Sequence, residues 1–183
     1  EYYHPSNSYI YIYGDMDVNE RLEYLDREYL SDFDVSDVDI HANIERQAAF
    51  DKPVYETKPY AITEDESLED NTYLSYNAVI GTSVDAKLYL AFQILDYALV
   101  MTPGAPVKQA LLDAGISTDV YSSYETSLHQ PVYSIVAKNS NSKEQDRFVS
   151  VINDTLEKLV KDGINERTIE AGINYYEFKY REA

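Results

Sequence analysis

The chain has 183 residues and no cysteine, which excludes disulfides, thiolate zinc sites and a cysteine nucleophile. Its 15 basic and 33 acidic side chains give a net charge of −18, a field that repels nucleic acid and anionic membranes and attracts basic peptides. Hydrophobic residues make up 44% of the chain, enough for one globular core, and no apolar run reaches the ~20 residues that a membrane-spanning helix requires.

The first segment is predicted to be a strand followed by an amphipathic helix. Tyr and Ile alternate over residues 9–13, a period of two that is typical of a strand. Asp17 then fits a helix N-cap, with Glu20 three residues later as in a capping box. Because an isolated strand has unsatisfied edges, we expect residues 9–13 to pair with a neighbour or to be covered by the helix. The helix stripe consists of Val18, Leu22, Leu25, Tyr29 and Phe33.

Residues 34–70 are predicted to be an acidic, proline-containing linker. Pro53 and Pro59 suit an extended connector and not a central strand. Residues 64–70 are rich in carboxylates and lack a clear apolar period, so we expect them to be solvated. We therefore place a domain boundary within residues 34–70.

The part from residue 71 onward begins with a strand and a long helix. The pattern predicts a strand over residues 72–80 and a helix over 84–100 with Ser83 as its cap. The helix is apolar nearly all round, and such a helix is usually buried. One face of the strand is expected to carry Leu74, Tyr76, Ala78 and Ile80.

A short helix and a hairpin are expected next. Pro103 and Gly104 break the long helix, Pro106 fits the first position of the short one, and Gly115 suits its end. Two strand patterns follow, over residues 116–126 and 131–138, separated by four residues of turn type.

Two further helices complete the pattern. Ser142 with Gln145 forms a capping box for the first of them, which Gly163 stops, and Asn165 caps the second. The resulting order, β-α-α-β-β-α-α, lacks strict βαβ alternation. It predicts an α+β fold with a mixed, largely antiparallel sheet covered by helices, preceded by the separate strand–helix unit.

No motif in the chain indicates a catalytic centre. The three histidines, His4, His41 and His129, are too far apart for H-E-x-x-H or H-x-x-E-H. A phosphate-binding glycine loop and a nucleophile elbow are both absent from the sequence. The acidic residues after Gly14 echo a calcium loop, but Glu20 stands where that loop requires glycine, so helix capping explains them better.

Two stretches resemble the pitrilysin/insulinase superfamily of zinc metallopeptidases. Tyr3-His4-Pro5-Ser6-Asn7 leads into the Tyr/Ile strand and ends at Gly14-Asp15, similar to the aromatic-x-Pro-x-Asn segment before the last strand of a catalytic domain. Residues 159–165 and 170–182 resemble the presequence-protease branch. The resemblance runs from about residue 2 to the end and is weakest over residues 34–70.

The resemblance implies a metallohydrolase-like α/β sandwich of the pitrilysin type and a place within a larger parent. Residues 1–33 would be the tail of the catalytic domain, residues 34–70 a linker, and residues 71–183 a second, non-catalytic domain truncated at its C-terminus. Both ends are expected to be cut. The parent would bind zinc through an inverse motif upstream of residue 1, so this part would carry no catalytic residue and no metal ligand.

The resemblance also implies a substrate-binding feature. In insulin-degrading relatives a Pro-Gly turn and an edge strand anchor the substrate, and the matching positions here are Pro103, Gly104, Val120, Tyr121 and Ser122. A peptide added to a sheet edge is held by backbone hydrogen bonds, which tolerate varied sequence. The chain has Ser122-Ser123 where those relatives have Gly-Gly, so an ordinary hairpin strand is the competing interpretation.

Three functions are consistent with these features. The first is a non-catalytic domain that walls the chamber of a peptidase and positions unfolded peptides, with the remaining domains of the parent and peptide substrates as partners. The second is the inactive scaffold or partner half of such a peptidase, and the third an acidic peptide-binding module. We expect neither nucleic acid nor a membrane as partner, and a cytoplasmic location.

Overall fold

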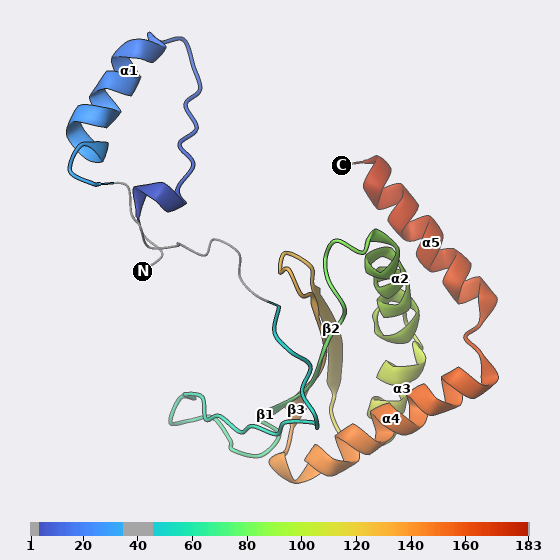
Figure 1. The fold of residues 1–183 in the computed structure, drawn as a ribbon. Helices are drawn as coiled ribbons and strands as arrows, with labels where there is room; N and C mark the ends of the chain where they lie inside the picture. Colours follow the sequence, from blue (N-terminus) through green and yellow to red (C-terminus); the bar gives the residue numbers. More distant parts are fainter. Residues whose placement is uncertain (1–3, 35–45, 183) are drawn as a thin grey trace. The chain divides into compact units, whose positions relative to one another are not determined.

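The computed structural model describes residues 4–34 and 46–182. The chain divides into two compact units, Glu1–Gln47 and Ala48–Ala183, and each is described by itself. Figure 1 shows the ribbon of both. That residues 1–33 belong to a preceding catalytic domain stays a prediction.

The described part of unit 1 is built around one amphipathic helix. A 3-10 turn, η1 (Pro5–Asn7), is followed by an extended segment and then by α1 (Val18–Leu25), which continues into a π-helical turn, η2 (Asp26–Leu30). The predicted cap is confirmed, because Asp17 Oδ1 accepts the backbone N–H groups of Asn19 at 2.9 Å and Glu20 at 3.1 Å.

The strand predicted over residues 9–13 is wrong. The segment is extended but joins no sheet within the described part of the chain. Tyr9, Tyr11 and Tyr13 are 104%, 87% and 87% exposed, so the following helix does not cover them either. A strand pattern becomes a strand only where a neighbour accepts its backbone hydrogen bonds, and the described residues supply no such neighbour to this segment.

Unit 2 confirms the predicted order β-α-α-β-β-α-α. Residues 46–71, which precede its first strand, contain neither helix nor strand. The elements are β1 (Thr72–Val79), α2 (Ala86–Asp96) with its π-helical extension η3 (Tyr97–Met101), α3 (Pro106–Asp113), β2 (Asp119–Glu125), β3 (Val132–Ser140), the 3-10 turn η4 (Ser142–Glu144), α4 (Gln145–Asp162) and α5 (Glu166–Arg181).

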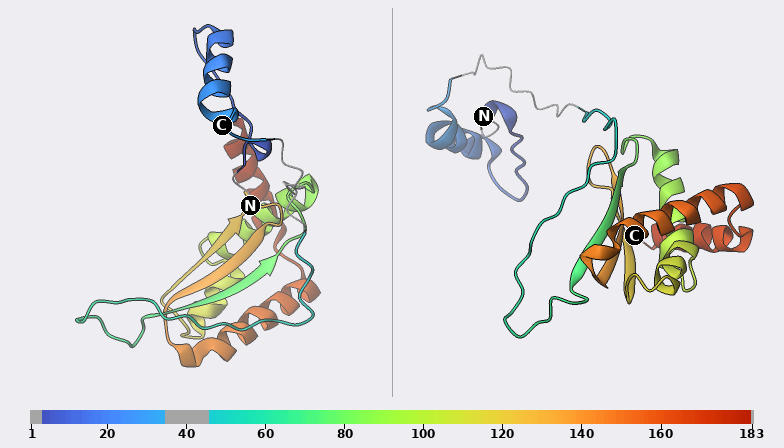
Figure 2. Two further views of the ribbon diagram at one scale, coloured as in Figure 1. Left: turned by 60° about the vertical axis from the view of Figure 1, so that its left-hand side comes forward. Right: turned by 90° about the horizontal axis from the view of Figure 1, so that it is seen from below.

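The three strands form one antiparallel sheet in the order β1-β3-β2. The helices of unit 2 all lie on one face of this sheet, which leaves the other face uncovered by helices (Figure 2). The predicted face of β1 is confirmed at Leu74, which is buried, while Tyr76, Ala78 and Ile80 are half-buried. The expected α+β architecture, with an antiparallel sheet covered by helices, is therefore present in unit 2.

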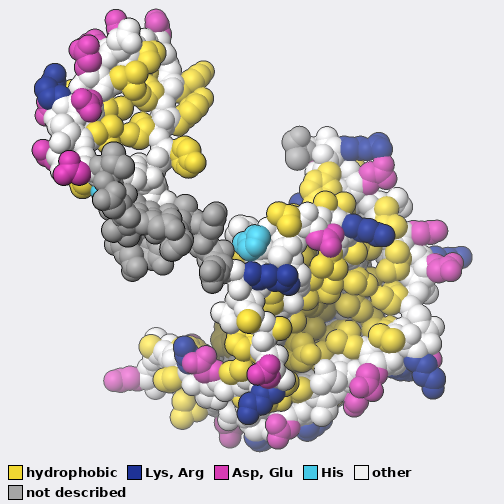
Figure 3. Space-filling model, in the orientation of Figure 1, with side chains coloured by type: hydrophobic (Ala, Val, Ile, Leu, Met, Phe, Trp, Pro, Cys, Tyr) yellow, Lys and Arg dark blue, Asp and Glu magenta, His cyan; other side chains and the backbone are white. Residues whose placement is uncertain are grey.

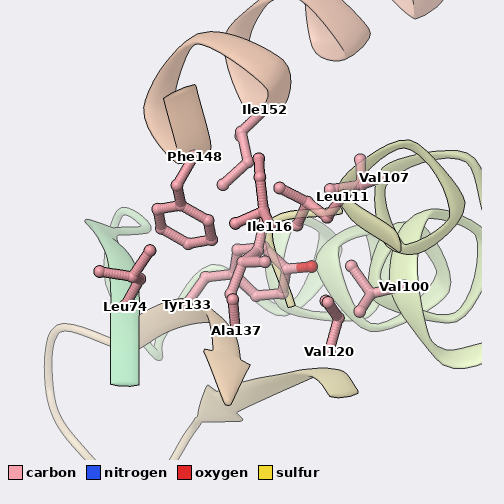
Figure 4. Packing of buried hydrophobic residues seen from close by; sticks show 11 residues of the cluster. Leu74, Val100, Val107, Leu111, Ile116, Val120, Tyr133, Ala137, Phe148 and Ile152 are labelled. Atoms are coloured by element: carbon pink, nitrogen blue, oxygen red, sulfur yellow. The ribbon is translucent and has the colours of Figure 1, made fainter. Parts of the chain in front are cut away.

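The core lies between the sheet and the helices (Figure 4). Leu74 from β1, Phe148 and Ile152 from α4, and Leu111 from α3 converge on the middle strand β3. Each of these side chains is at most 7% exposed. Burial of apolar surface on this scale supplies the main favourable term for folding.

The helix ends predicted at glycine residues are confirmed, whereas the two helix caps predicted at serine residues are wrong. Gly115 and Gly163 follow α3 and α4 with φ of +65° and +85°, a region that favours glycine. Asn165 caps α5 as expected, accepting from Arg167 N at 2.9 Å. Ser83 is not the cap of α2, because Asp85 accepts from Leu88 N at 3.0 Å instead. Ser142 opens a 3-10 turn before α4 and does not cap it.

Candidate peptide-binding edge of the sheet

Strand β2 forms one edge of the sheet. It pairs with β3 along one side, and no other described strand pairs with its second side. The backbone N–H and C=O groups that point away from β3 are therefore available to an added strand. An extended peptide can bind such an edge by main-chain hydrogen bonds.

The three predicted binding residues of β2 point in alternating directions. Val120 is fully buried and pairs with Ala137, so only its backbone can serve a ligand. Tyr121 is 44% exposed, on the face that the helices do not cover. Ser122 returns to the helix-covered face and is half-buried. Of the three, Tyr121 offers the largest side-chain contact to an incoming strand.

Pro103 and Gly104 form the turn between η3 and α3. Gly104 has φ of +72°, and nothing lies within 4 Å of the place where a side chain would begin. The turn is closed by the hydrogen bond from Ala105 N to Thr102 O at 3.0 Å. Because η3 and α3 both contact β2, the turn connects two elements that lie against the edge strand. It is exposed, as a binding turn must be.

A buried polar group lies beneath β2. Asp96 of α2 is 6% exposed, and its Oδ1 accepts a hydrogen bond from Tyr133 Oη at 3.0 Å. The hydroxyl oxygen of Ser122 is enclosed near the same pair and has no partner with hydrogen-bonding geometry. Sequence analysis missed Asp96, because an acidic residue inside an apolar helix carries no signal of which face it occupies.

Burial controls the protonation of this cluster. Removal from water raises the pKa of Asp96, and the hydrogen bond from Tyr133 only partly opposes that rise. Burial and the neighbouring carboxylate raise the pKa of Tyr133, and burial raises that of Tyr176 to about 12. The tyrosines therefore stay protonated at neutral pH, and no activated nucleophile results.

Aromatic side chains join α5 to α2 and to its extension η3. Tyr175 stacks on Tyr97 with ring centroids 5.2 Å apart, and Tyr180 Oη donates to Gln93 Oε1 at 2.6 Å. Gly172 lets the helices approach, since a Cβ there would stand 3.1 Å from Tyr97 and 3.2 Å from Ile94.

The described residues do not fit a zinc ion. Among residues 4–34 and 46–182, no three His, Cys, Asp or Glu side chains are gathered as metal ligands. The Nδ1 atom of His4 accepts from Ser6 N at 3.2 Å, and His41 lies outside the described residues. Asp17, from the sequence that echoes a calcium loop, is engaged as a helix cap.

One apolar stretch differs from the expectation of no membrane-length run. Ala86–Asp113 contains an 18-residue window with mean hydropathy 1.2, long and apolar enough to span a membrane by length and composition. In the structure this stretch is two helical segments separated at the Pro103-Gly104 turn. Val100, Val107 and Leu111 from it are core residues. We therefore assign the stretch to the core of unit 2.

Comparison with known proteins places the chain among peptidase domains. The family described as "Peptidase M16 inactive domain" matches residues 1–176. Protein HypA of Clostridium perfringens is 40% identical over 182 residues, and presequence protease 1 of Arabidopsis thaliana, chloroplastic/mitochondrial, is 33% identical over 184 residues. The alignments cover 100% of this chain but 18% and 17% of these relatives, so the chain spans less than a fifth of their length.

Two solved structures share the fold. One is the inactive peptidase domain of a Bordetella parapertussis protein assigned as a zinc protease, with a TM-score of 0.53 and 14% identity. The other is from Bordetella pertussis Tohama I, also assigned as a zinc protease, with a TM-score of 0.52 and 13% identity. Each superposition covers 60% of this chain and 60% or 61% of the solved chain. At these identities the likeness concerns the fold alone.

Proposed function

Because the chain belongs to the peptidase M16 inactive-domain family, within the pitrilysin/insulinase superfamily, we propose that it helps to wall the chamber of a zinc-dependent peptidase and positions unfolded peptides there. The observation that carries the proposal is the free edge of β2, whose backbone groups can take up a further strand. Binding through the backbone suits an enzyme that must accept many sequences.

The charge of the chain supports peptide capture. A net charge of −18 attracts basic segments and speeds their approach. The edge strand itself carries Asp119 and Glu125 at its two ends. A basic extended peptide is therefore the ligand class that both the backbone edge and the surrounding field favour.

The chemistry of peptide hydrolysis would be supplied elsewhere in the parent. The described residues do not fit zinc, and no hydrolytic step is assigned to them. An H-x-x-E-H motif upstream of residue 1 would support an active parent, and a degraded motif would favour the inactive scaffold half. The family match includes residues 1–33, whose place in a catalytic domain stays a proposal, as does a cytoplasmic location.

Backbone methylation of a bound peptide tests the edge-binding proposal directly. A basic, unstructured peptide is titrated against the 183-residue chain, first unmodified and then N-methylated at alternate residues in two complementary sets. In an added strand, every second N–H faces the partner. One methylated set should weaken binding at least about tenfold, as loss of more than one net hydrogen bond predicts, while the other set binds nearly as well as the parent peptide.

Equal weakening by both sets, or by neither, would contradict binding as an added strand. Binding that disappears at high salt and ignores methylation would favour the acidic peptide-binding module, because surface charges are screened by salt. The matched control is Val160→Lys on α4, an exposed site outside the sheet, which should leave the alternate-residue pattern unchanged.

A further inference from the structure

An extended segment with two prolines precedes the sheet in unit 2. Residues 53–59 contain neither helix nor strand, and none of their backbone groups has a hydrogen-bond partner among the described residues. The segment runs on the side of the sheet that the helices leave open (Figure 1, Figure 2). Its side chains are exposed as well, with Val54 at 69% and Tyr55 at 63%. The segment therefore resembles a strand that has no neighbour.

The two prolines limit this segment to pairing along one side. In a strand, the backbone N–H groups of successive residues point to opposite sides. Pro53 and Pro59 are six residues apart, so both lie on the same side, and proline has no N–H to donate. The N–H groups of Val54 and Glu56 lie on the other side. Proline occurs in edge strands in this arrangement, so the segment can join a sheet only as its outermost strand.

The free edge of β2 presents the backbone groups of every second residue. Ile80 N donates to Pro131 O at 2.8 Å, so the backbone groups of Pro131 face β1. Because these groups alternate along a strand, those of Val132 face β2, where Val132 pairs with Glu125. The backbone groups of Glu125 in turn face β3. The residues of β2 whose groups face away from β3 are therefore Val120, Ser122 and Tyr124.

One antiparallel register joins the two sets of backbone groups. With Val54 opposite Ser122, the N–H and C=O groups of these two residues face each other while both prolines face solvent. The same register places Tyr55 opposite Tyr121 on the helix-free face. Cross-strand aromatic pairs of this kind stabilise sheets. Figure 3 shows hydrophobic side chains at the surface of unit 2, and covering some of them is favourable.

The segment is held at one end, close enough to reach this edge. Tyr60 Oη donates to Asn71 Oδ1 at 2.7 Å, and its ring lies edge-on to Tyr73 with centroids 5.7 Å apart. A strand added to β2 lies three strand spacings, about 14 Å, from β1. The two residues from 58 to 60 span about 7 Å when extended, and the paired tyrosine side chains span the rest. The anchor at Tyr60 is therefore compatible with pairing at β2.

The charge of the segment matches that of the proposed ligand. Residues 52–58 contain two lysines and one glutamate, a net charge of 2 − 1 = +1 in a chain of net charge −18. The edge strand carries acidic residues at both ends. A basic, extended stretch of backbone is thus present in the chain itself, on a short tether to the sheet.

We propose that residues 53–59 bind reversibly to the free edge of β2 as an added strand and occupy it until a peptide displaces them. The structure shows the open state. The competition with peptide rests on the proposed function, whereas the pairing does not. A ligand on a short flexible tether acts at an effective concentration on the order of millimolar. The segment would therefore exclude weakly binding peptides and shield the edge from aggregation.

Disulfide trapping tests the pairing, since the chain has no cysteine of its own. Tyr55→Cys is combined with Tyr121→Cys in the 183-residue chain. The matched control combines it with Ser75→Cys, which lies on the same face of the sheet in β1. Directly opposite residues of an antiparallel pair lie within the Cα distance of a disulfide. The 55–121 bond should form at least about tenfold faster than the 55–75 bond, as measured by mass spectrometry.

Two proline substitutions separate strand pairing from mere proximity. Val54→Pro removes an N–H that faces Ser122, whereas Thr57→Pro alters a residue whose N–H faces solvent. Both positions are exposed, and thermal melts verify that both variants fold. Val54→Pro should slow the 55–121 disulfide about fivefold, as loss of one net hydrogen bond predicts, and Thr57→Pro should leave it unchanged. Equal effects of both, a faster 55–75 bond or a bond between two chains would overturn the pairing.

A basic peptide separates this inference from the proposed function. A peptide that binds with the alternate-residue methylation pattern should slow the 55–121 disulfide, and Val54→Pro should raise its affinity about fivefold. If the peptide binds with that pattern but changes neither quantity, the inference is wrong and the proposed function stands. If the disulfide and its proline pattern appear but no peptide binds, the pairing is supported and the proposed function is contradicted.

Discussion

The two edges of the sheet differ in how they meet solvent. β2 has a helix layer over its inner face, with Val120 fully buried, and an acidic residue at each end. β1 has no charged residue, and Tyr76 and Ala78 on its inner face are only half-buried. An edge protected by charge and covered on one side can stay free for a transient ligand. The uncharged edge of β1 lacks that protection.

The largest effect on stability is expected from a core side chain that packs beneath the start of β1. Phe148 is 1% exposed and packs with Leu74 beneath that strand. Phe148→Ala should lower the free energy of unfolding by about 3–5 kcal/mol, since it removes a buried ring and leaves a cavity. Urea denaturation measures the loss. A loss below about 1 kcal/mol would show that the β1 side is not packed as described.

A smaller effect is expected at the turn on the β2 side. Gly104 adopts φ of +72° with open space around it, so an added side chain meets strain but no clash. Gly104→Ala should cost about 1–2 kcal/mol of stability from the left-handed backbone. The matched control is an alanine substitution at Ser123, which is exposed and lies in regular β2. If both substitutions lower the free energy of unfolding by the same amount, the backbone at Gly104 is not strained by a side chain.

The buried carboxyl beneath β2 predicts a pH dependence. Burial raises the pKa of Asp96 in the folded state above its usual value near 3.8. The contribution of Asp96 to the free energy of unfolding is therefore fully present below that value. It is lost as the pH rises through the raised pKa of the folded state. Thermal melts from about pH 4 to pH 8 should show the wild type losing stability relative to Asp96→Asn as pH rises. If the stability of the wild type relative to Asp96→Asn increases as the pH rises, the prediction is wrong.

Substitutions on the two edge strands should have the smallest effect on stability. They are expected to differ in their effect on self-association of the chain. Val79→Lys on β1 and Tyr121→Lys on β2 alter side chains that are 47% and 44% exposed. Each should change the free energy of unfolding by less than about 0.5 kcal/mol. If the 183-residue chain self-associates through its uncharged edge, Val79→Lys should reduce the association and Tyr121→Lys should not. Sedimentation velocity distinguishes them, and the opposite pattern would assign association to β2.

The local elements of unit 2 could be predicted because their signals are local. The strand patterns of β1 and β3, the proline that opens α3 and the glycine that ends α4 each act within a few residues. The caps of α2 and α4 could not be chosen in the same way. Asp85 and Ser83 both have suitable side chains, and the approach of the chain to the helix decides which one reaches a free N–H group.

The candidate site likewise combines features that the sequence predicts with features that only the fold determines. The family resemblance points to the candidate binding residues Pro103, Gly104, Val120, Tyr121 and Ser122. The edge position of β2 follows only from the strand order in the folded sheet. Asp96 lies beneath that edge because α2 crosses the sheet with this residue inward, and its partner Tyr133 is 37 residues away in the chain. A contact over such a separation leaves no local pattern.

By itself the sequence determined the absence of cysteine chemistry, the strong negative charge, and the order of strands and helices in unit 2, because composition and short-range periodicity act independently of distant residues. Only the tertiary structure decided that residues 9–13 form no strand, that β2 and β1 are the two edges, and that several leucines of the long apolar helix are only half-buried. Strand pairing and burial depend on which distant segments meet, and that outcome belongs to the whole fold.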